Sequence, residues 1–358
     1  TYVASPLLLA DQNFEFNIAT VPIRHMIFGD NEQYSPKENK WAFGVPANPV
    51  YNHTSVMLPN ADMPIMGGKK CSNADNFCTA LQASTGPVAY IYLFDDAWAD
   101  GAALPIGRRN HTSTVLPNGN VLVAGGEGTN DVLTDCSLYS LAGSSWTPTG
   151  ALRQQRSHHS ATLLPNGTVL VAGGFISAAS TGSTRRSELY FPETGTWVET
   201  SPMISSRAYH TATLLSDGNV LVTGGYTSQN YIQSAEIYFS TAHKWVQVGD
   251  LNIARDRHTA TLLRNGRVLI AGGFNAANGI LNDIEIFNPA TSSFDNTTPD
   301  NLNTGRHSHT ATLLADGRVL VVGGTDGFWE IGKAEIYNTT AAVGTQWAKT
   351  DPNGWGPG

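Results

Sequence analysis

Histidine and arginine recur along this chain at a fixed spacing, in five copies of the phrase Arg-x-x-His. The arginines are Arg108, Arg156, Arg207, Arg255 and Arg306, and the histidines, with one earlier copy, are His53, His111, His159, His210, His258 and His309. A ring of imidazoles could bind a metal ion or an anion, and guanidinium groups could attract an anion. Residues that every copy keeps are more typical of structure. We therefore predict one repeated hydrogen bond between units for the histidines, and salt bridges or carbonyl contacts between units for the arginines.

Other groups that could do chemistry are sparse. The sequence contains no His-Glu-x-x-His, no Gly-x-Ser-x-Gly, no phosphate-binding glycine loop and no Cys-x-x-Cys. Three stretches rich in Asp and Asn could hold Ca²⁺, namely Asn130-Asp131, Asn282-Asp283 and Asp326-Gly327, but none has the spacing of an EF-hand loop. We therefore predict no cofactor and no dedicated metal site, and leave calcium as the ion that these stretches could bind.

A repeat of about 50 residues must position these groups. Its marker is a pair of glycines, found at Gly67/Gly68, Gly125/Gly126, Gly173/Gly174, Gly224/Gly225, Gly272/Gly273 and Gly323/Gly324. Before these pairs come runs of the type His-Thr-Ala-Thr-Leu-Leu and Val-Leu-Val. In five copies Asn-Gly or Asp-Gly joins the two runs, which is the strongest short signal for a β-hairpin. Short β-type runs at this period are typical of a propeller rather than a helical solenoid.

The second half of each unit fixes the number of units. A polar turn separates two aromatic residues, as between Tyr190 and Trp197, and the closing aromatics are Trp41, Trp98, Trp146, Trp197, Trp245, Phe294 and Trp347. These seven residues predict an all-β fold, a seven-bladed β-propeller with four antiparallel strands per blade, in a single domain over residues 1–358. The predicted blades are 1–47, 48–105, 106–153, 154–204, 205–252, 253–303 and 304–358.

The glycine pairs, the Tyr seven residues before a Trp and the Arg-x-x-His copies resemble the Kelch family, and in particular its galactose-oxidase-like extracellular propellers. Tyr209-His210 also looks like the copper-binding Tyr-His of the copper-radical oxidases. That family's site needs a thioether-linked Cys–Tyr pair and a further His, and here no Cys occupies an innermost-strand position. The resemblance therefore implies the fold and makes Tyr209 and His210 the first catalytic candidates if the chain is an enzyme. It does not lead us to expect copper.

Residues that break the repeat are the better candidates for a binding site. After the glycine pairs the chain continues with Lys69, Glu127, Phe175, Tyr226, Phe274 and Thr325, and the last of these loops adds Phe328 and Trp329. These loops and the Arg-x-x-His segments should emerge on one face. We predict that they form a rim around the mouth of a central channel, to which the five arginines would add an anion-attracting edge if they are exposed. Exposed aromatics stack on sugars or pack on a protein partner, although capping of blade edges would also explain them.

Composition narrows the class of protein further. Charged residues make up only 14% of the chain and the net charge is −8, so we expect no nucleic-acid partner. No apolar run is long enough for a membrane span. Cys71 and Cys78 lie in one loop and predict a disulfide, with two free thiols as the alternative, whereas Cys136 is predicted to be buried. With five Asn-x-Ser/Thr sequons and no initiator Met, these features predict a processed chain that is extracellular or periplasmic.

We therefore expect a binding or interaction module that recognises a glycan or protein partner at the propeller rim, rather than an enzyme. The alternative is a carbohydrate-active enzyme, such as a lyase, hydrolase or oxidase, with its site at the mouth of the central channel. A structural or assembly subunit is the second alternative. The sequence leaves the oligomeric state open.

Overall fold

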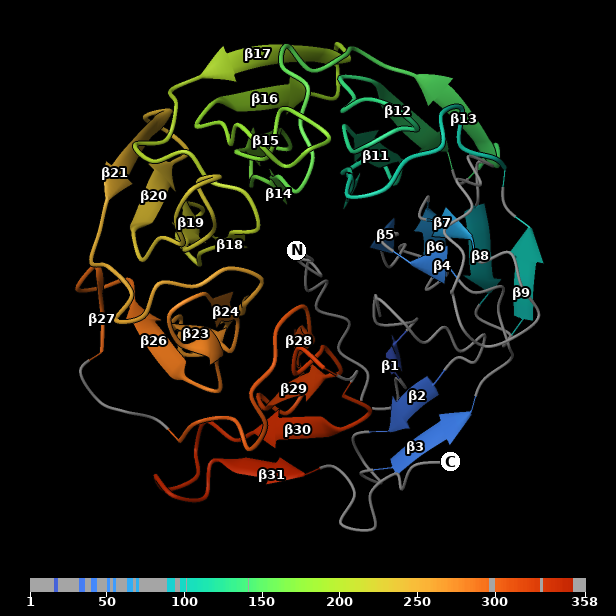
Figure 1. Ribbon diagram of the computed structural model, residues 1–358. Coiled ribbons are helices and arrows are strands. Elements are labelled where there is room, and N and C mark those ends of the chain that lie inside the picture. Colours follow the sequence, from blue (N-terminus) through green and yellow to red (C-terminus); the bar gives the residue numbers. More distant parts are fainter. Residues whose placement is uncertain are drawn as a thin grey trace.

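The chain forms a ring of antiparallel β-sheets around a central axis (Figure 1). The computed structural model describes residues 102–349 apart from 141, 296–299, 329–330, and, before residue 102, the strands alone. Among these residues, six sheets have four strands each, one sheet has three, and two further pairs of short strands are present. The same residues contain no helix long and apolar enough to cross a membrane. The prediction of an all-β fold with four antiparallel strands per unit is confirmed.

Each four-stranded sheet after residue 102 is one sequence unit, with its first strand nearest the axis and its fourth on the outside (Figure 1). The first three of these sheets are β10 (Thr112–Val115), β11 (Val121–Ala124), β12 (Cys136–Ser140) and β13 (Ser145–Pro148); β14 (Ser160–Leu163), β15 (Val169–Ala172), β16 (Ser187–Phe191) and β17 (Thr196–Thr200); and β18 (Thr211–Leu214), β19 (Val220–Thr223), β20 (Ala235–Phe239) and β21 (Lys244–Gln247). The last two are β22 (Thr259–Leu262), β23 (Val268–Ala271), β26 (Ile284–Asn288) and β27 (Ser293–Phe294); and β28 (Thr310–Leu313), β29 (Val319–Val322), β30 (Ala334–Tyr337) and β31 (Trp347–Lys349).

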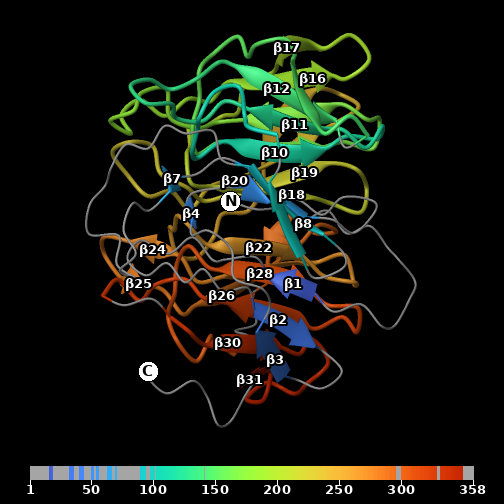
Figure 2. The same ribbon diagram turned by 90° about the vertical axis from the view of Figure 1, so that its right-hand side faces the viewer.

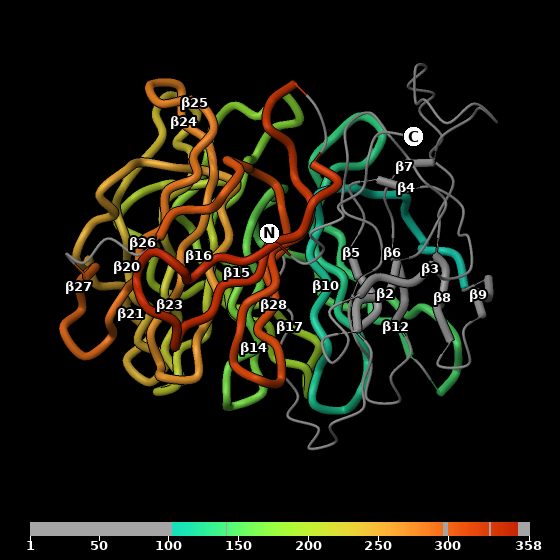
Figure 3. The backbone as a smooth tube through the Cα atoms, turned by 90° about the horizontal axis from the view of Figure 1, so that it is seen from below, coloured from blue at the N-terminus to red at the C-terminus, as the bar shows by residue number. Residues whose placement is uncertain are grey.

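The remaining strands complete the ring. They are β1 (Phe16–Ile18), β2 (Glu32–Ser35) and β3 (Lys40–Phe43) in the three-stranded sheet; β5 (Thr54–Ser55), β6 (Met63–Met66), β8 (Ala89–Leu93) and β9 (Ala97–Asp100) in the sixth four-stranded sheet; and the pairs β4 (Val50–Tyr51) with β7 (Lys69–Lys70) and β24 (Phe274–Asn275) with β25 (Gly279–Ile280). Figure 2 shows the sheets from a second direction, and in Figure 3 the β24–β25 hairpin projects from one end of the ring. The seven-blade count and the boundaries from 1–47 to 304–358 stay predictions.

The aromatic pairs that mark the units lie directly opposite each other on the last two strands of their sheets. The observed cross-strand partners are Tyr34 and Trp41, Tyr92 and Trp98, Tyr139 and Trp146, Tyr190 and Trp197, Tyr238 and Trp245, Phe287 and Phe294, and Tyr337 and Trp347. The ring centroids of Tyr190 and Trp197 are 5.0 Å apart, and the indole N–H of Trp197 donates to the carbonyl oxygen of Gly150 at 2.9 Å. Because Gly150 follows the preceding sheet, this hydrogen bond joins one sheet to the next.

The core lies between neighbouring sheets. All four residues of β15 are buried, which explains why the second strands read as unbroken apolar runs rather than alternating ones. On the next sheet Val220 and Val222 pack against Leu170 and Ala172, so each interface is filled by second-strand side chains from both sides. Cys136 in β12 has no exposed surface, as predicted, and burial raises the pKa of its thiol to about 12.

The glycine pair is required where one unit meets the next. Gly125 has φ 60°, in the left-handed region, and a Cβ there would lie 2.6 Å from the carbonyl oxygen of Arg156 in the following unit. The N–H of Gly126 donates to that same oxygen at 2.8 Å. Any side chain at Gly125 would therefore push apart two sheets that are held together by this hydrogen bond.

Candidate functional site: a ring of unlike residues around the axis

The repeated histidines form a buried layer between sheets. The Nε2 atom of His159 lies 3.0 Å from Thr112 Oγ1 on the preceding sheet, and that of His210 lies 2.9 Å from Ser160 Oγ. His258 and His309 repeat this contact with Thr211 and Thr259. Burial is the main cause that lowers the pKa of these four imidazoles, to about 3 at His309, so they are neutral. The predicted hydrogen bond between units is confirmed, and the Nε2 atom of His210 is already engaged in it.

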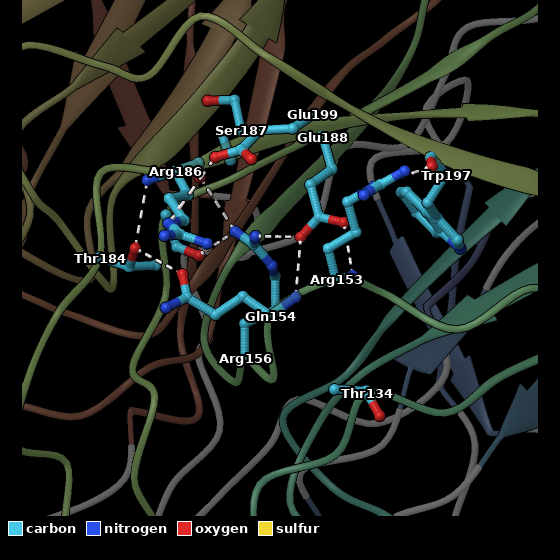
Figure 4. Close-up of polar contacts among 12 residues, drawn as sticks. Thr134, Arg153, Gln154, Arg156, Thr184, Arg186, Ser187, Glu188, Trp197 and Glu199 are labelled. Atoms are coloured by element: carbon cyan, nitrogen blue, oxygen red, sulfur yellow. Dashed lines mark hydrogen bonds and ion pairs between the residues drawn. The ribbon is translucent and has the colours of Figure 1, made fainter.

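The repeated arginines lie in the same layer and form pairs within a unit. The guanidinium of Arg156 is fully buried, and its Nη2 donates to Glu188 Oε1 at 2.6 Å (Figure 4). Its Nη1 donates to the carbonyl oxygens of Gly173 and Arg186 at 2.8 and 3.0 Å. The other pairs are Arg108 with Asp135, Arg207 with Glu236, Arg255 with Glu285 and Arg306 with Glu335.

Both partners in each of these pairs belong to the same sheet unit. Salt bridges and carbonyl contacts are therefore present as predicted, but the prediction that they run between units is wrong. The reason is that Glu188 lies on the third strand of the unit that Arg156 enters, and it also accepts from the backbone N–H of Arg153 at 2.7 Å. The five arginines are at most 2% exposed and do not face solvent at the rim.

One step closer to solvent lies a ring made by the residues that directly precede the repeated histidines. Its described members are Asn110, His158, Tyr209, Arg257 and Ser308, and all five adopt left-handed backbone angles, with φ of 54°, 52°, 55°, 51° and 56°. From His158 onward, each backbone N–H donates to the carbonyl oxygen of the member before it: His158 to Asn110 at 3.0 Å, Tyr209 to His158 at 3.3 Å, Arg257 to Tyr209 at 3.1 Å and Ser308 to Arg257 at 2.9 Å. We call these five residues the axial ring.

All five members of the axial ring share the same strained, left-handed backbone, whereas their side chains differ at every position. A left-handed angle is unfavourable for bulky residues such as His158, Tyr209 and Arg257 and would suit glycine better. Strain of this kind persists only where the surrounding structure holds it, and it clusters at functional sites. The axial ring is therefore the first place to look for a ligand site.

A carboxylate with charged partners lies beside the first members of the ring. Glu127 is 4% exposed; its Oε2 accepts from Arg109 Nε at 2.8 Å, and its Oε1 lies 3.4 Å from His158 Nε2. Burial alone would raise the pKa of Glu127, but His158 and the Arg109 guanidinium outweigh it and lower that pKa to about 2. Burial also lowers the pKa of His158, so at neutral pH the positive charge beside Glu127 is that of Arg109. We call Arg109, Glu127 and His158 the Glu127 corner.

Tyr209 links this corner to a second one. Its ring centroid is 4.2 Å from that of His158, and its hydroxyl oxygen is 3.3 Å from His158 Nε2. The guanidinium carbon of Arg257 lies 4.3 Å from the centroid of the same ring, which is a cation–π contact. The ring of Tyr209 thus lies between an imidazole and a guanidinium from the neighbouring units.

The second corner holds a carboxylate without such partners. Asp256 is 1% exposed, and its Oδ1 lies 3.7 Å from Arg257 Nη1, beyond hydrogen-bond length. Among the described residues Oδ1 has no hydrogen-bond partner. Burial raises the pKa of Asp256 to about 6, and the charge of Arg257 offsets this only in part. Burial, and then the charge of Asp256, also raise the pKa of Tyr231. We call Asp256, Arg257 and Tyr231 the Asp256 corner.

Aromatic rings form an arc beside the axial ring. Successive centroids are 5.4 Å apart for Phe175 and Tyr209, 6.5 Å for Phe175 and Tyr226, 5.0 Å for Tyr226 and Tyr231, and 5.6 Å for Tyr231 and Phe274. Phe175 is fully buried and supports the other four, which are half-buried. We call Phe175, Tyr209, Tyr226, Tyr231 and Phe274 the aromatic arc.

The structure brings four of the predicted rim residues together at the axial ring, namely Glu127, Phe175, Tyr226 and Phe274. Isolated β-bridges join each segment that leads into the axial ring to the residue after a glycine pair, as between Arg109 and Glu127, and between Asp256 and Phe274. The prediction that these segments share one face is confirmed. Phe328 lies on the β29–β30 loop and is 89% exposed. Lys69 is placed only by its strand, and Trp329, Cys71 and Cys78 lie outside the described residues.

Six residues of the site were missed from the sequence. They occupy the unspecified positions of Arg-x-x-His, where attention went to the constant residues, and they are Arg109, Asn110, His158, Asp256, Arg257 and Ser308. The signal was present, because these two positions read differently in every copy: Arg-Asn, Ser-His, Ala-Tyr, Asp-Arg and His-Ser. Within the described parts of the chain, no three His, Cys, Asp or Glu side chains are grouped to hold a metal ion.

Comparisons with known proteins bear on the fold. A family model described as the KLHDC2/KLHL20/DRC7 Kelch-repeats domain matches residues 110–324. No curated protein matches the chain. The solved structure of YjhT is similar with a TM-score of 0.62 and 16% identity, over 84% of this chain and 97% of that one. A fungal alcohol oxidase of the AA5 family in complex with copper has a TM-score of 0.67 and 16% identity, over 87% of this chain and 72% of the oxidase.

Proposed function

We propose that this chain, which belongs to the Kelch-repeat domain family, is a binding module that recognises a glycan at the axial ring. The observation that carries the proposal is the aromatic arc, which places four half-buried rings beside polar groups from several units. Kelch domains mediate protein interactions, and a protein partner is therefore the main competing ligand.

The chemistry of the arc suits a sugar. The C–H face of a pyranose packs on an aromatic ring, while its hydroxyls need hydrogen-bond partners at the edge of that ring. Tyr209 and Tyr231 offer both at once, because each combines a ring with a hydroxyl and lies next to the charged Arg257. The extracellular or periplasmic localisation predicted from composition is part of the same proposal, since such compartments expose proteins to glycans.

A glycan-array screen of the purified protein, followed by calorimetry with the best ligand, tests the proposal. Tyr226→Ala should weaken binding about tenfold, because it removes one stacking face of the arc. Val343→Ala is the control and should leave affinity unchanged, since Val343 is an exposed apolar residue in the β30–β31 hairpin, away from the aromatic arc. A blank array, or equal affinities for wild type and Tyr226→Ala, would overturn glycan recognition at the arc and favour a protein partner.

One observation favours a second candidate, a carbohydrate-active enzyme. The Tyr209 hydroxyl lies 3.3 Å from His158 Nε2, so a proton donor and a neutral imidazole face each other at the axial ring. This pair replaces Tyr209 and His210, because His210 is bonded to Ser160 in the buried layer. If the ligand from the array is turned over, Tyr209→Phe should abolish turnover while binding persists. Turnover unchanged in Tyr209→Phe would exclude this role.

A further inference from the structure

We propose that Asp256 and Arg257 form the polar half of the sugar site and take a neutral sugar through two adjacent hydroxyl groups. This inference rests on the proposed function and names the class of ligand. It starts from Asp256, because a buried carboxylate oxygen without a hydrogen-bond partner is rare in folded proteins and carries a desolvation cost.

The positions equivalent to Asp256 in the other units show that the fold does not require a carboxylate there. The corresponding residues are Arg109, Ser157, Ala208 and His307. Ala208 has no polar side-chain atom and is equally buried, and Arg109 is satisfied by its ion pair with Glu127. An acid at this one position is therefore not explained by packing or by the repeated backbone geometry.

The surroundings of Asp256 place an acceptor and a donor side by side. Its Oδ1 is 3.7 Å from Arg257 Nη1, too far for a mutual hydrogen bond but close enough for one small group to contact both. Arg257 has a side chain that is 29% exposed and stacks on Tyr209, which holds the guanidinium in place without using a carboxylate. The acceptor of this pair is thus recessed and its donor reaches solvent.

A pair of neighbouring sugar hydroxyls fits this arrangement. One hydroxyl can donate to the Asp256 carboxylate and the next can accept from the Arg257 guanidinium, while the ring packs on the aromatic arc. A uronate in the same place would bring a second carboxylate against Asp256, and like charges at short distance are unfavourable. The site should therefore prefer neutral sugars with vicinal hydroxyls.

Binding through an ionised Asp256 makes affinity depend on pH. In the free protein the pKa of Asp256 is about 6, and a hydroxyl that donates to the carboxylate stabilises the ionised form. Affinity should then be full above pH 7 and fall as the pH drops through 6. The charged and titratable groups that face Asp256 are Arg257 and Tyr231, and neither changes its charge in this window, because the pKa of Arg257 and that of Tyr231 are both raised.

Calorimetry with four methyl pyranosides tests the inference: the mannoside, the galactoside, the glucoside and the glucuronide. The wild-type protein should bind at least one neutral glycoside more tightly than the glucuronide, and lose about tenfold in affinity between pH 7 and pH 5. Asp256→Asn, which is nearly isosteric, should lose about tenfold at pH 7 and show no such pH dependence. Asp316→Asn is the matched control, because Asp316 is an exposed carboxylate in the β28–β29 hairpin, and it should bind as the wild type does.

The outcomes separate the two proposals. If neutral glycosides bind and Tyr226→Ala weakens them, but Asp256→Asn binds as tightly as wild type, the role of Asp256 is refuted and glycan recognition stands. A glucuronide that binds more tightly than the glucoside also refutes it. If the array yields a ligand but no pyranoside binds the wild-type protein, the role of Asp256 is refuted and glycan recognition stands, whereas a blank array overturns both proposals. A thermal denaturation curve for Asp256→Asn ensures that a loss of binding is not a loss of fold.

Discussion

Glu127 and Asp256 both lie beside the axial ring, and both are almost fully buried, but their surroundings treat the two carboxylates in opposite ways. Glu127 has Arg109 at 2.8 Å and His158 at 3.4 Å, and its pKa falls to about 2. In the described part of the chain, the only charged group near the Asp256 carboxylate is Arg257 at 3.7 Å, and burial raises the pKa of Asp256 to about 6. Depth of burial is nearly the same for the two carboxylates, so their hydrogen-bonded partners decide whether the pKa is lowered or raised.

The difference indicates which corner has unused binding capacity. A carboxylate that already accepts from a guanidinium has little to offer a ligand, whereas one that is buried without a partner gains a hydrogen bond when a ligand supplies the donor. Asp256 therefore lowers the stability of the free protein and raises the free energy available for binding. This is the usual relation between strain and function at a site.

The largest expected effect comes from making the Glu127 corner resemble the Asp256 corner. Arg109→Met removes the cation and leaves Glu127 buried without its charged partner, which should lower the free energy of unfolding by about 3 kcal/mol. The pKa of Glu127 should rise from about 2 toward its ordinary value, because burial is then opposed by His158 alone. Urea denaturation and a carboxyl NMR titration measure the two quantities. Arg318→Met, which breaks an exposed pair with Asp316, should change stability by less than about 1 kcal/mol.

A smaller effect of opposite sign is expected at the other corner. The pKa of Asp256 is raised from 3.8 to about 6, so the ionised carboxylate opposes folding. The stability that the protein has with Asp256 protonated is therefore fully present below pH 4 and is lost as the pH rises through 6. Asp256→Asn should therefore stabilise the protein by about 2 kcal/mol at pH 8 and leave it unchanged near pH 4. Denaturation curves at both pH values test this.

The same measurement on Glu127→Gln gives the matching control. The folded-state pKa of Glu127 is depressed from 4.5 to about 2, so its contribution to stability is present above pH 4.5 and is lost as the pH falls toward 2. Glu127→Gln should accordingly destabilise the protein at pH 8. If both variants shift stability in the same direction at pH 8, the contrast between the two corners is mistaken.

The smallest expected effect sharpens the cause assigned to Asp256. Tyr231→Ala should admit water beside the carboxylate and lower the pKa of Asp256 by about one unit, toward its ordinary value. A carboxyl NMR titration detects the change. Phe328→Ala, at an exposed ring on another loop, should leave that pKa where it is. An unchanged pKa in Tyr231→Ala would mean that the backbone, rather than the aromatic arc, desolvates Asp256.

The repeat predicts the scaffold well because it records contacts that every unit makes. The opposed Tyr190 and Trp197, the left-handed Gly125 and the hydrogen bond of His210 to the neighbouring sheet all follow from residues that recur at fixed spacing. The arginine pairs were only half predicted. Spacing alone indicated a salt bridge, but it could not tell whether Glu188 would lie in the same unit as Arg156 or in the next.

The site was predicted less well, for a physical reason. The loops after the glycine pairs were chosen because they vary, and they do contribute Glu127 and Phe274. The residues between the constant Arg and His also vary, but nothing in the sequence shows that a residue such as Arg257 adopts a left-handed angle that turns its side chain onto Tyr209. That geometry arises from hydrogen bonds between units, which become visible only when the ring is assembled.

The axial ring separates recognition from folding in a way that engineering can use. Its members are tied together by main-chain hydrogen bonds, whereas the arginines, glutamates and histidines beneath make the side-chain contacts that recur in each unit. One substitution per unit therefore rewrites one part of a binding surface without disturbing its neighbours' backbone. A library randomised at Asn110, His158, Tyr209, Arg257 and Ser308 should yield many folded variants with altered specificity, as the complementarity-determining loops of antibodies do.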